Sequence, residues 1–431
     1  MIKIKGGRLF DPKNGIDEEG DIYIVDGKVR KEGAAEIEID AAGLYVFPGF
    51  VDLHAHLREP GREDEETIET GSRAAVKGGF TSVCAMPNTE PPVDNQGVAR
   101  FVKEKGEKAG YARIFPIGTI TKGRKGEEIS EFGDLIEGGC VGVSDDGDCV
   151  RRSDIIRRAL EYAKMFNIPV IEHPEDTYLS EGGQINEGRI STILGMGGIP
   201  SISESIIVAR DIEIANFVGG WIHLTHISVK DSLEKIIEGR KKQRGKITCD
   251  VTAHHLVLTE DKVKEFNSNF KMKPPLRSEE DRRALVWGLR NGVIDAIITD
   301  HAPHAFFEKE LEFDLAPFGV VGLETAFSSL YTYLVEKGEL ELATLVMYLS
   351  SSPALLFSLP YGEIRDGGIA DLVLVDLKGE WEVREDTLAS KSKNSPYLGE
   401  KLRGVVVCTI VDGRIVYREG EWRRRNEGIS S

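Results

Sequence analysis

Eight apolar runs recur along the middle of the chain, and most of them end in a polar side chain. They lie near residues 46–54, 80–86, 112–119, 139–145, 168–172, 221–226, 246–253 and 293–299. Their Val, Ile and Phe content, with little polar alternation, is typical of parallel strands buried on both faces. Helix-like segments, including 153–163 with Ser153 as a candidate N-cap, lie between several runs. Eight such alternations predict an α/β fold, a closed (β/α)₈ TIM-type barrel over residues 46–358.

Both ends of the chain have a β-rich pattern that the middle lacks. Residues 22–25, the turn pair Asp26-Gly27 and residues 28–29 form one hairpin signal, and residues 405–417 form another around Asp412-Gly413. A barrel needs only about 250 residues, so a chain of 431 residues has room for a second domain. We expect residues 1–45 and 359–431 to form one small β-sandwich domain. Two separate β appendages would fit the same pattern.

The composition narrows the class of protein. A hydrophobic content of 40% and a charged content of 29% are ordinary for a soluble enzyme. The net charge of −17 argues against a nucleic acid or an anionic membrane as partner. The five cysteines include no C-x-x-C pair, which favours reduced thiols. No signal-peptide pattern is present at the N-terminus, and no apolar run approaches about 18 residues. We therefore expect a cytoplasmic enzyme with a small-molecule substrate.

The polar residues at the strand ends are of the types that bind transition metals. His54 and His56 close the first run, and the alternation of side chains along a strand places both on one face. Four further candidates follow the fourth, fifth, sixth and eighth runs: Asp146, His173, His226 and Asp300. Barrel enzymes carry their sites at these strand ends. Six ligands are too many for one tetrahedral ion with an open position but suit two ions. Zn²⁺ fits this ligand set, and Co²⁺ or Mn²⁺ could substitute.

Longer motifs surround these residues. Residues 50–61 read Phe-Val-Asp-Leu-His-Ala-His-Leu-Arg-Glu-Pro-Gly, and shorter motifs occupy residues 85–89, 144–147 and 299–304. The first part of the long motif resembles the metal-binding motif of the amidohydrolase superfamily. Its Leu-Arg-Glu-Pro-Gly continuation and the shorter motifs resemble class I dihydroorotases. The resemblance covers nearly the whole chain, termini included, and the set of motifs is far more specific than His-x-His alone.

The resemblance implies two zinc ions per subunit. The more buried ion would be held by His54, His56 and Asp300, and the second by His173 and His226. Many amidohydrolases bridge their ions with a carboxylated lysine, but the run 139–145 contains none. Asp146 would then bridge the ions together with a hydroxide. Asp145 is the competing choice, because only one of two adjacent strand side chains faces inward.

The resemblance also implies a reaction, the reversible cyclisation of N-carbamoyl-L-aspartate to (S)-dihydroorotate with loss of water, the third step of de novo pyrimidine biosynthesis. In hydrolysis the bridging hydroxide would attack the cyclic amide, and Asp300 would carry the proton to the leaving nitrogen. Arg58 suits bidentate capture of the substrate carboxylate. Further substrate contacts are implied for His56, Asn88, His304, Phe318 and Gly319.

One position departs from the family pattern. Bacterial enzymes usually carry Asn before the Pro-Pro pair at 274–275, and this chain has Lys273. Lys273 could meet the substrate carboxylate as a point charge, turn to solvent, or indicate another substrate. The rival functions are allantoinase and dihydropyrimidinase, which are sibling cyclic amidases, and a catalytically dead scaffold of the same fold. The scaffold reading does not explain why all six candidate ligands are present, and neither does a metal-free binding module.

The resemblance further implies a homodimer and, in some members, association with aspartate transcarbamoylase. The residues themselves decide neither. The charged segment 305–316 follows the eighth run. It is expected to be either a mobile loop over the site or a solvated connector.

Overall fold

The computed structural model describes residues 1–426, and within them the predicted barrel is present. Parallel pairing runs from β6 through β7 to β8, and from β9 through β10, β13 and β14 to β15. Bridges between Gly118 and Val143 and between Ala55 and His301 join these two groups into a closed ring. The barrel strands are β6 (Phe50–Ala55), β7 (Phe80–Ala85), β8 (Arg113–Pro116), β9 (Val143–Ser144), β10 (Val170–Glu172), β13 (Trp221–Leu224), β14 (Lys246–Thr252) and β15 (Ala296–Ile298).

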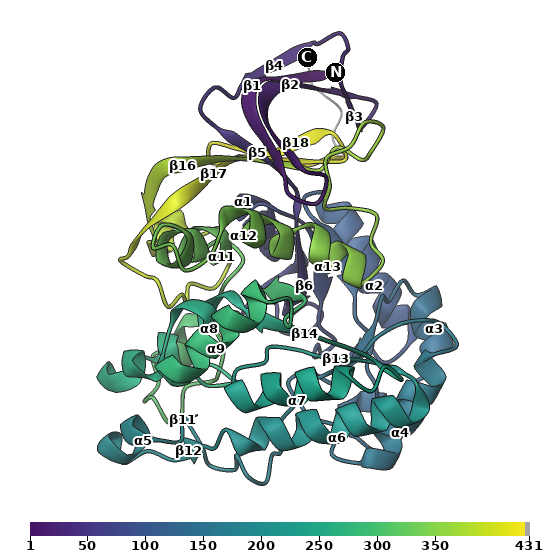
Figure 1. Cartoon of the computed structure of the whole chain (residues 1–431), viewed down its shortest axis with the longest axis vertical. Coiled ribbons are helices and arrows are strands. Elements are labelled where there is room, and N and C mark those ends of the chain that lie inside the picture. Colours follow the sequence, from purple (N-terminus) through teal and green to yellow (C-terminus); the bar gives the residue numbers. More distant parts are fainter. Residues whose placement is uncertain (427–431) are drawn as a thin grey trace.

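Helices connect the barrel strands and surround them (Figure 1). The helix predicted over 153–163 is α4, but Ser153 is its first helical residue, and Arg152 holds the N-cap position without a side-chain cap. The helices are α1 (Ile68–Lys77), α2 (Gln96–Ala109), α3 (Phe132–Glu137), α4 (Ser153–Ala163), α5 (Arg189–Leu194), α6 (Ile202–Val218), α7 (Lys230–Arg240), α8 (Ala253–Val257), α9 (Glu279–Arg290), α10 (Phe306–Lys309), α11 (Ala326–Leu330), α12 (Leu342–Leu349) and α13 (Ser351–Leu356). None of the helices in residues 1–426 has the length and apolar character needed to cross a bilayer.

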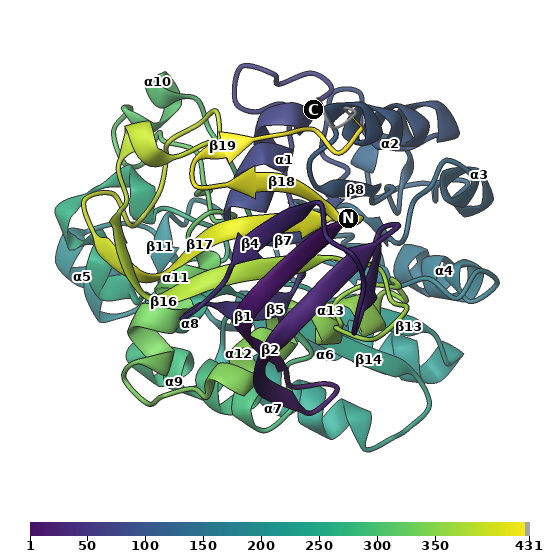
Figure 2. The ribbon, with the colours of Figure 1, turned by 90° about the horizontal axis from the view of Figure 1, so that it is seen from above.

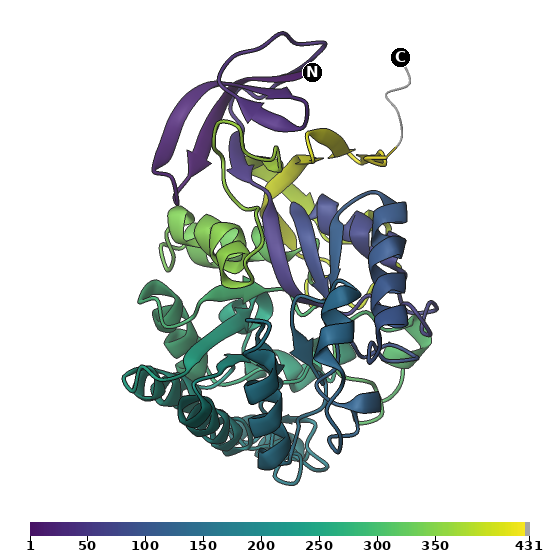
Figure 3. The same cartoon turned by 90° about the vertical axis from the view of Figure 1, so that its right-hand side faces the viewer.

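The two ends of the chain form one sheet, as predicted. Its strand order is β19-β18-β17-β16-β5-β1-β2-β3, with β4 paired to β1. Figure 2 shows these strands side by side across one end of the molecule, and the side view in Figure 3 shows the barrel below them. The strands are β1 (Ile2–Asp11), β2 (Ile16–Val25), β3 (Lys28–Arg30), β4 (Ile37–Asp40), β5 (Tyr45–Pro48), β16 (Leu372–Glu382), β17 (Lys401–Val411), β18 (Arg414–Arg418) and β19 (Glu421–Trp422).

The small β-sandwich domain has a core that draws on both termini. Ile4 and Ile24 from the N-terminal strands pack with Leu372 and Ile410 from the C-terminal strands. Because β5 pairs with both β1 and β16, the two terminal segments are hydrogen-bonded into one unit. This excludes the alternative of two separate appendages.

The run predicted as the first barrel strand, 46–54, is two strands. Residues up to Pro48 belong to β5 in the terminal sheet, and β6 begins at Phe50 in the barrel. Gly49 separates them at a point of close approach, since a Cβ there would lie 2.4 Å from Thr81 Cγ2. Both strands are buried, so hydropathy alone did not reveal the break. The exact domain boundaries, 45/46 and 358/359, stay a prediction.

Candidate active site

The six predicted metal ligands converge at the carboxyl ends of the barrel strands, where each is at most 8% exposed. Asp146 lies at their centre. Its Oδ2 is 3.3 Å from His54 Nε2 and 3.5 Å from His56 Nε2. Its Oδ1 is 3.4 Å from His173 Nδ1 and 3.2 Å from His226 Nε2. One carboxylate therefore presents one oxygen to each of two imidazole pairs.

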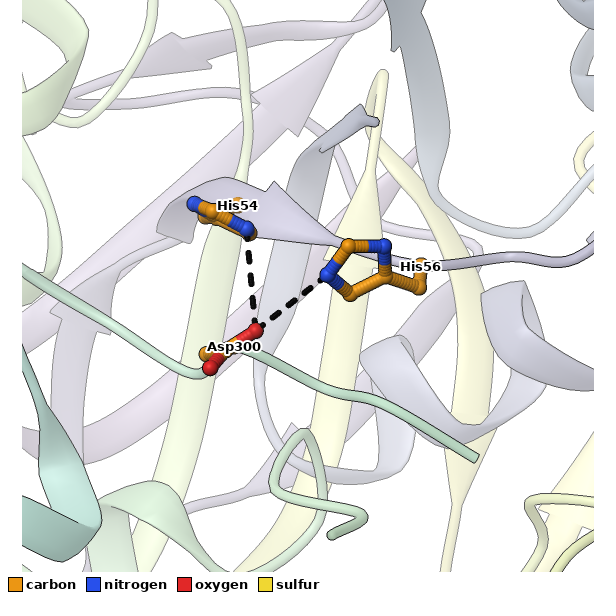
Figure 4. A group of neighbouring side chains, drawn as sticks. All are labelled: His54, His56 and Asp300. Carbon is orange, nitrogen blue, oxygen red and sulfur yellow. Dashed lines mark ion pairs between the residues drawn. The ribbon is translucent and has the colours of Figure 1, made fainter. Parts of the chain in front are cut away.

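Asp300 completes the first of these pairs (Figure 4). Its Oδ1 lies 3.6 Å from His54 Nε2 and 3.3 Å from His56 Nε2. The three side chains come from the end of β6 and from the residues after β15. Figure 4 shows these side chains pointing toward one another. Their donor atoms are close enough to share one ion.

Asp145, the competing candidate, faces away from this cluster. Its Oδ1 accepts a hydrogen bond of 3.0 Å from the Thr121 backbone N–H, and its other oxygen accepts from the Thr121 hydroxyl. The alternation rule is thus obeyed, with Asp146 inward and Asp145 outward.

Hydrogen bonds behind the imidazoles leave Nε2 of His54 free for a metal. Thr225 Oγ1 lies 3.1 Å from Asp250 Oδ1 and 2.8 Å from His54 Nδ1. Since a hydroxyl has one proton and an ionised carboxylate has none, Thr225 donates to Asp250 and accepts from His54. His54 Nδ1 therefore carries the ring proton. Its Nε2 is buried without a hydrogen-bond partner. This ring nitrogen is therefore oriented to bind a metal ion.

Two further imidazoles are oriented in the same way. His56 Nδ1 lies 2.8 Å from Asn88 Oδ1, so Nε2 faces the cluster. His173 Nε2 lies 3.3 Å from Glu175 Oε2, so Nδ1 is the inward atom. Lys273 pairs with the same Glu175 oxygen at 2.9 Å and is one-third exposed. Lys273 thus lies beside the cluster rather than out in solvent.

The carboxylates and imidazoles at the centre of the cluster shift one another's pKa. Burial alone would raise the pKa of the Asp146 carboxyl, but the imidazoles of His54, His173 and His226 hold that pKa well below its usual range. Burial would lower the pKa of His54, but Asp146 and Asp300 together raise it to about 9. The carboxylates thus favour positive charge at the imidazoles, and a divalent ion would replace protons there. The residues fit a buried metal site.

A second group of charges flanks the metal ligands. Glu65, 2% exposed, forms an ion pair with Arg58, with Oε2 2.9 Å from Nε, and pairs with His304 Nδ1 through Oε1 at 2.9 Å. Arg58 Nε also donates to Pro303 O at 3.1 Å. Arg58 therefore pairs with a buried carboxylate and not with one at the surface. Glu65 holds two predicted substrate-binding groups in one place.

Buried Lys309 holds the segment 305–319 together, and buried Lys271 fastens the segment to the barrel through a bond from its Nζ to Phe313 O at 2.7 Å. Lys309 Nζ donates to Pro317 O at 2.9 Å and to Gly319 O at 3.0 Å. The Gly319 N–H donates to Lys271 O at 2.9 Å, and Phe318 O lies 2.7 Å from His304 Nε2. The segment carries the short helix α10 and is therefore more ordered than a solvated connector.

Sequence reasoning missed several residues that support the site. Glu175 follows His173 by two residues, the same spacing as His54 and His56, so strand alternation carried that signal. Thr225 directly precedes His226, and no sequence pattern indicated its role. Asp250 lies 25 residues after Thr225, and Glu65 lies near Arg58 in sequence but far from its other partner, His304, so nothing local marked their roles.

Comparisons with known proteins agree with this geometry. A family model described as dihydro-orotase-like matches residues 43–232. The dihydroorotase of Pelobacter propionicus is 47% identical over 423 residues, which cover 97% of this chain and 99% of that protein. The dihydroorotase of Caldicellulosiruptor saccharolyticus is 46% identical over 428 residues, with the same coverage. The solved L-hydantoinase (dihydropyrimidinase) from Arthrobacter aurescens superposes with a TM-score of 0.87 at 25% identity, covering 98% of this chain and 97% of that one.

The barrel, the composite β domain and the buried His/Asp cluster define a cyclic amidohydrolase. Within that class the chain belongs to the dihydroorotase family, since relatives 46–47% identical match it over almost its full length.

Proposed function

We propose that this enzyme interconverts (S)-dihydroorotate and N-carbamoyl-L-aspartate in pyrimidine biosynthesis. The observation that carries the proposal is the placement of Asp146 between two imidazole pairs, with Asp300 on one side. This arrangement supports a site that polarises an amide and moves a proton at one barrel mouth. Arg58, with its side chain 11% exposed, adds a cation suited to a carboxylated ring.

Two zinc ions are the cofactor we propose. His54, His56 and Asp300 would hold one ion, and His173 and His226 the other, with Asp146 shared between them. When bound, the ions polarise the amide carbonyl and lower the pKa of the attacking water toward about 7. The orphaned Nε2 of His54 and the two-sided contacts of Asp146 support this assignment.

Asp300 is the proposed catalytic residue. In hydrolysis it accepts a proton as the water oxygen bonds to the ring carbonyl carbon. It then gives that proton to the ring nitrogen as the carbon–nitrogen bond breaks, and cyclisation reverses both steps. Burial opposes ionisation, but His56 and His54 keep the pKa of Asp300 below its usual range. Asp300 is thus ionised at rest, as a proton acceptor must be.

The substrate contacts are proposed on the same side of the cluster. Arg58 Nε donates to the carbonyl of Pro303, three residues after Asp300, which supports a guanidinium on the Asp300 side of the cluster. Arg58 and His304 would bind the carboxylate, with Lys273 as an added point charge. Asn88, already bonded to His56, would reach the same group through its amide. His56 would also contact the substrate, and Phe318 and Gly319 would line the ring.

The direct test is an assay of metal-quantified protein in both directions. We expect dihydroorotate hydrolysis that is lost on chelation and restored by about two equivalents of Zn²⁺. Asp300→Asn, which keeps the side-chain volume, should reduce kcat by at least about a thousandfold. Protein with two bound ions that turns over neither compound would reject the proposal.

We also propose a cytoplasmic homodimer. All five cysteines are buried and unpaired, which supports a reducing compartment. Light scattering on the purified chain would give twice the chain mass of 47.6 kDa for a dimer. Association with aspartate transcarbamoylase is proposed from the family resemblance alone, and co-elution of the two purified proteins would test it.

A further inference from the structure

A segment of the small domain reaches the substrate side of the barrel. Residues 388–398 lie between β16 and β17, and Asn394 in this segment is 4% exposed. Its Nδ2 donates to Ala302 O and to Gly319 O, each at 3.1 Å. Its Oδ1 accepts from the His304 backbone N–H at 3.2 Å. One side chain thus uses both amide donors and its acceptor on two loops of the barrel.

These two loops carry the proposed substrate contacts, and they touch each other. A Cβ on Gly319 would lie 2.8 Å from Ala302 Cβ and 2.9 Å from His304 Nε2. The backbone carbonyl of Asn394 also accepts a hydrogen bond from the Val321 N–H at 3.0 Å. Asn394 therefore contacts the chain on both sides of the junction between residues 302–304 and residues 319–321.

The same segment reaches the group that holds Arg58. Ser392 Oγ donates to Glu65 O at 2.6 Å, and the Glu65 carboxylate pairs with Arg58 and His304. Ser390 contacts Glu66 next to it. Arg58, His304 and Gly319 are thus tied, directly or through Glu65, to residues 390–394.

We propose that Asn394 is a positioning residue that sets the spacing between His304 and the Phe318–Gly319 pair, and so couples the small domain to substrate binding. The proposal rests on the function proposed above, because those residues are substrate contacts only under that function. An amide is needed because it alone offers two donors and one acceptor in a plane. A carboxylate of the same shape would face the carbonyl oxygens of Ala302 and Gly319 with no proton to share.

The test compares Asn394→Asp with a matched control, Asn216→Asp. Asn216 is also 4% exposed, donates to Gly239 O at 3.1 Å and accepts from the Gly245 N–H at 3.1 Å. It lies next to the start of β14, at the end of the barrel away from the site. Asn394→Asp loses two donated hydrogen bonds and Asn216→Asp loses one, and only Asn394 touches the substrate loops.

We expect Asn394→Asp to raise the KM for dihydroorotate about tenfold or more, with kcat changed less than about threefold, since misplacement of binding groups costs affinity before chemistry. Asn216→Asp should also lower the melting temperature, but it should leave KM unchanged. Equal KM values for the two variants, or a kcat loss without a KM change, would overturn the inference.

Hydrogen exchange gives a readout that does not depend on turnover. Peptides covering 302–321 should exchange faster in Asn394→Asp than in wild type, and at the wild-type rate in Asn216→Asp. Unchanged exchange in Asn394→Asp would overturn the positioning role. Wild-type protein without dihydroorotate turnover would reject the proposed function instead, and the exchange data would then decide whether Asn394 orders the two loops.

Discussion

Asp145 and Asp146 are neighbours in the sequence with opposite surroundings. Asp146 is enclosed by four imidazoles, and Asp145 is bonded to Thr121. If Asp146 bridges two ions, its removal must weaken both sites. Asp145 should be irrelevant to metal.

We predict that Asp146→Ala lowers the metal content from about two ions per chain to one or fewer. Asp145→Asn, which keeps the bond from the Thr121 N–H, should retain the wild-type content. Mass spectrometry of metals on the dialysed proteins measures this. Two ions retained in Asp146→Ala would show that another group bridges.

Lys273 is a residue where this chain departs from the pattern that the family resemblance implies. It contacts Glu175 at 2.9 Å, which in turn contacts His173. If Lys273 contacts the substrate, replacing it should affect only rings that carry a carboxylate. If it only pairs with Glu175, replacing it should affect the proposed metal ligand His173, and so the turnover of every substrate.

We predict that Lys273→Met raises the KM for dihydroorotate about tenfold and leaves kcat/KM for the neutral ring dihydrouracil within about twofold. The ratio of the two effects is the measurement. Equal losses of kcat/KM on both rings, with the same losses in Glu175→Gln, would show that Lys273 supports His173 and does not bind the substrate.

The strands and the convergence of the candidate ligands were predictable because their signals are local. The barrel strands are buried runs, and each candidate ligand lies at or just after the carboxyl end of such a run. The break at Gly49 was not predictable, because β5 and β6 are equally apolar and the reason for the glycine is Thr81, more than thirty residues away. Asn394 and Glu65 were missed because their roles depend on tertiary contacts with loops that the sequence does not place beside them.

The segment 305–319 contains a buried cation whose charge state depends on pH. Lys309 is 7% exposed, and burial lowers its pKa from 10.5 to about 7. The nearby Lys271 acts in the same direction, and Glu308 opposes it. A neutral amine still has two N–H groups, which match the carbonyls of Pro317 and Gly319.

The sign of the pH effect follows from proton counting. Between about pH 7 and pH 10 the unfolded chain binds a proton on Lys309 that the folded chain does not, so the free energy of unfolding rises with pH, by at most about 1.4 kcal/mol per unit. We predict that Lys309→Met flattens this rise in urea titrations at pH 7.5 and 9.5. An unchanged slope would contradict the lowered pKa of Lys309.

At the scale of the whole molecule, one buried cation joins the barrel to the small domain. Arg113 on β8 donates to Asp371 Oδ1 at 3.0 Å and also contacts Asp412 in the turn between β17 and β18. Arg113 and Asp371 are buried, so the pair is shielded from solvent. The small domain is thus attached through charge as well as through β5.

We predict that Arg113→Ala lowers the free energy of unfolding by about 3–5 kcal/mol, because it leaves the Asp371 carboxylate buried and unpaired. Arg152→Ala, which removes an exposed ion pair with Asp154, should change stability little. Denaturant titration of the two variants measures the difference. Equal stabilities would mean that solvent reaches Asp371.

Selectivity for a carboxylated ring tests the central claim most directly. Metal-quantified wild-type protein would be assayed for kcat/KM on (S)-dihydroorotate and on dihydrouracil, which has the same ring without the carboxylate. A site that pairs Arg58 and His304 with that carboxylate predicts a preference of at least about a thousandfold for dihydroorotate. Equal values, or a preference for dihydrouracil, would contradict the account and make this chain a neutral-ring amidohydrolase.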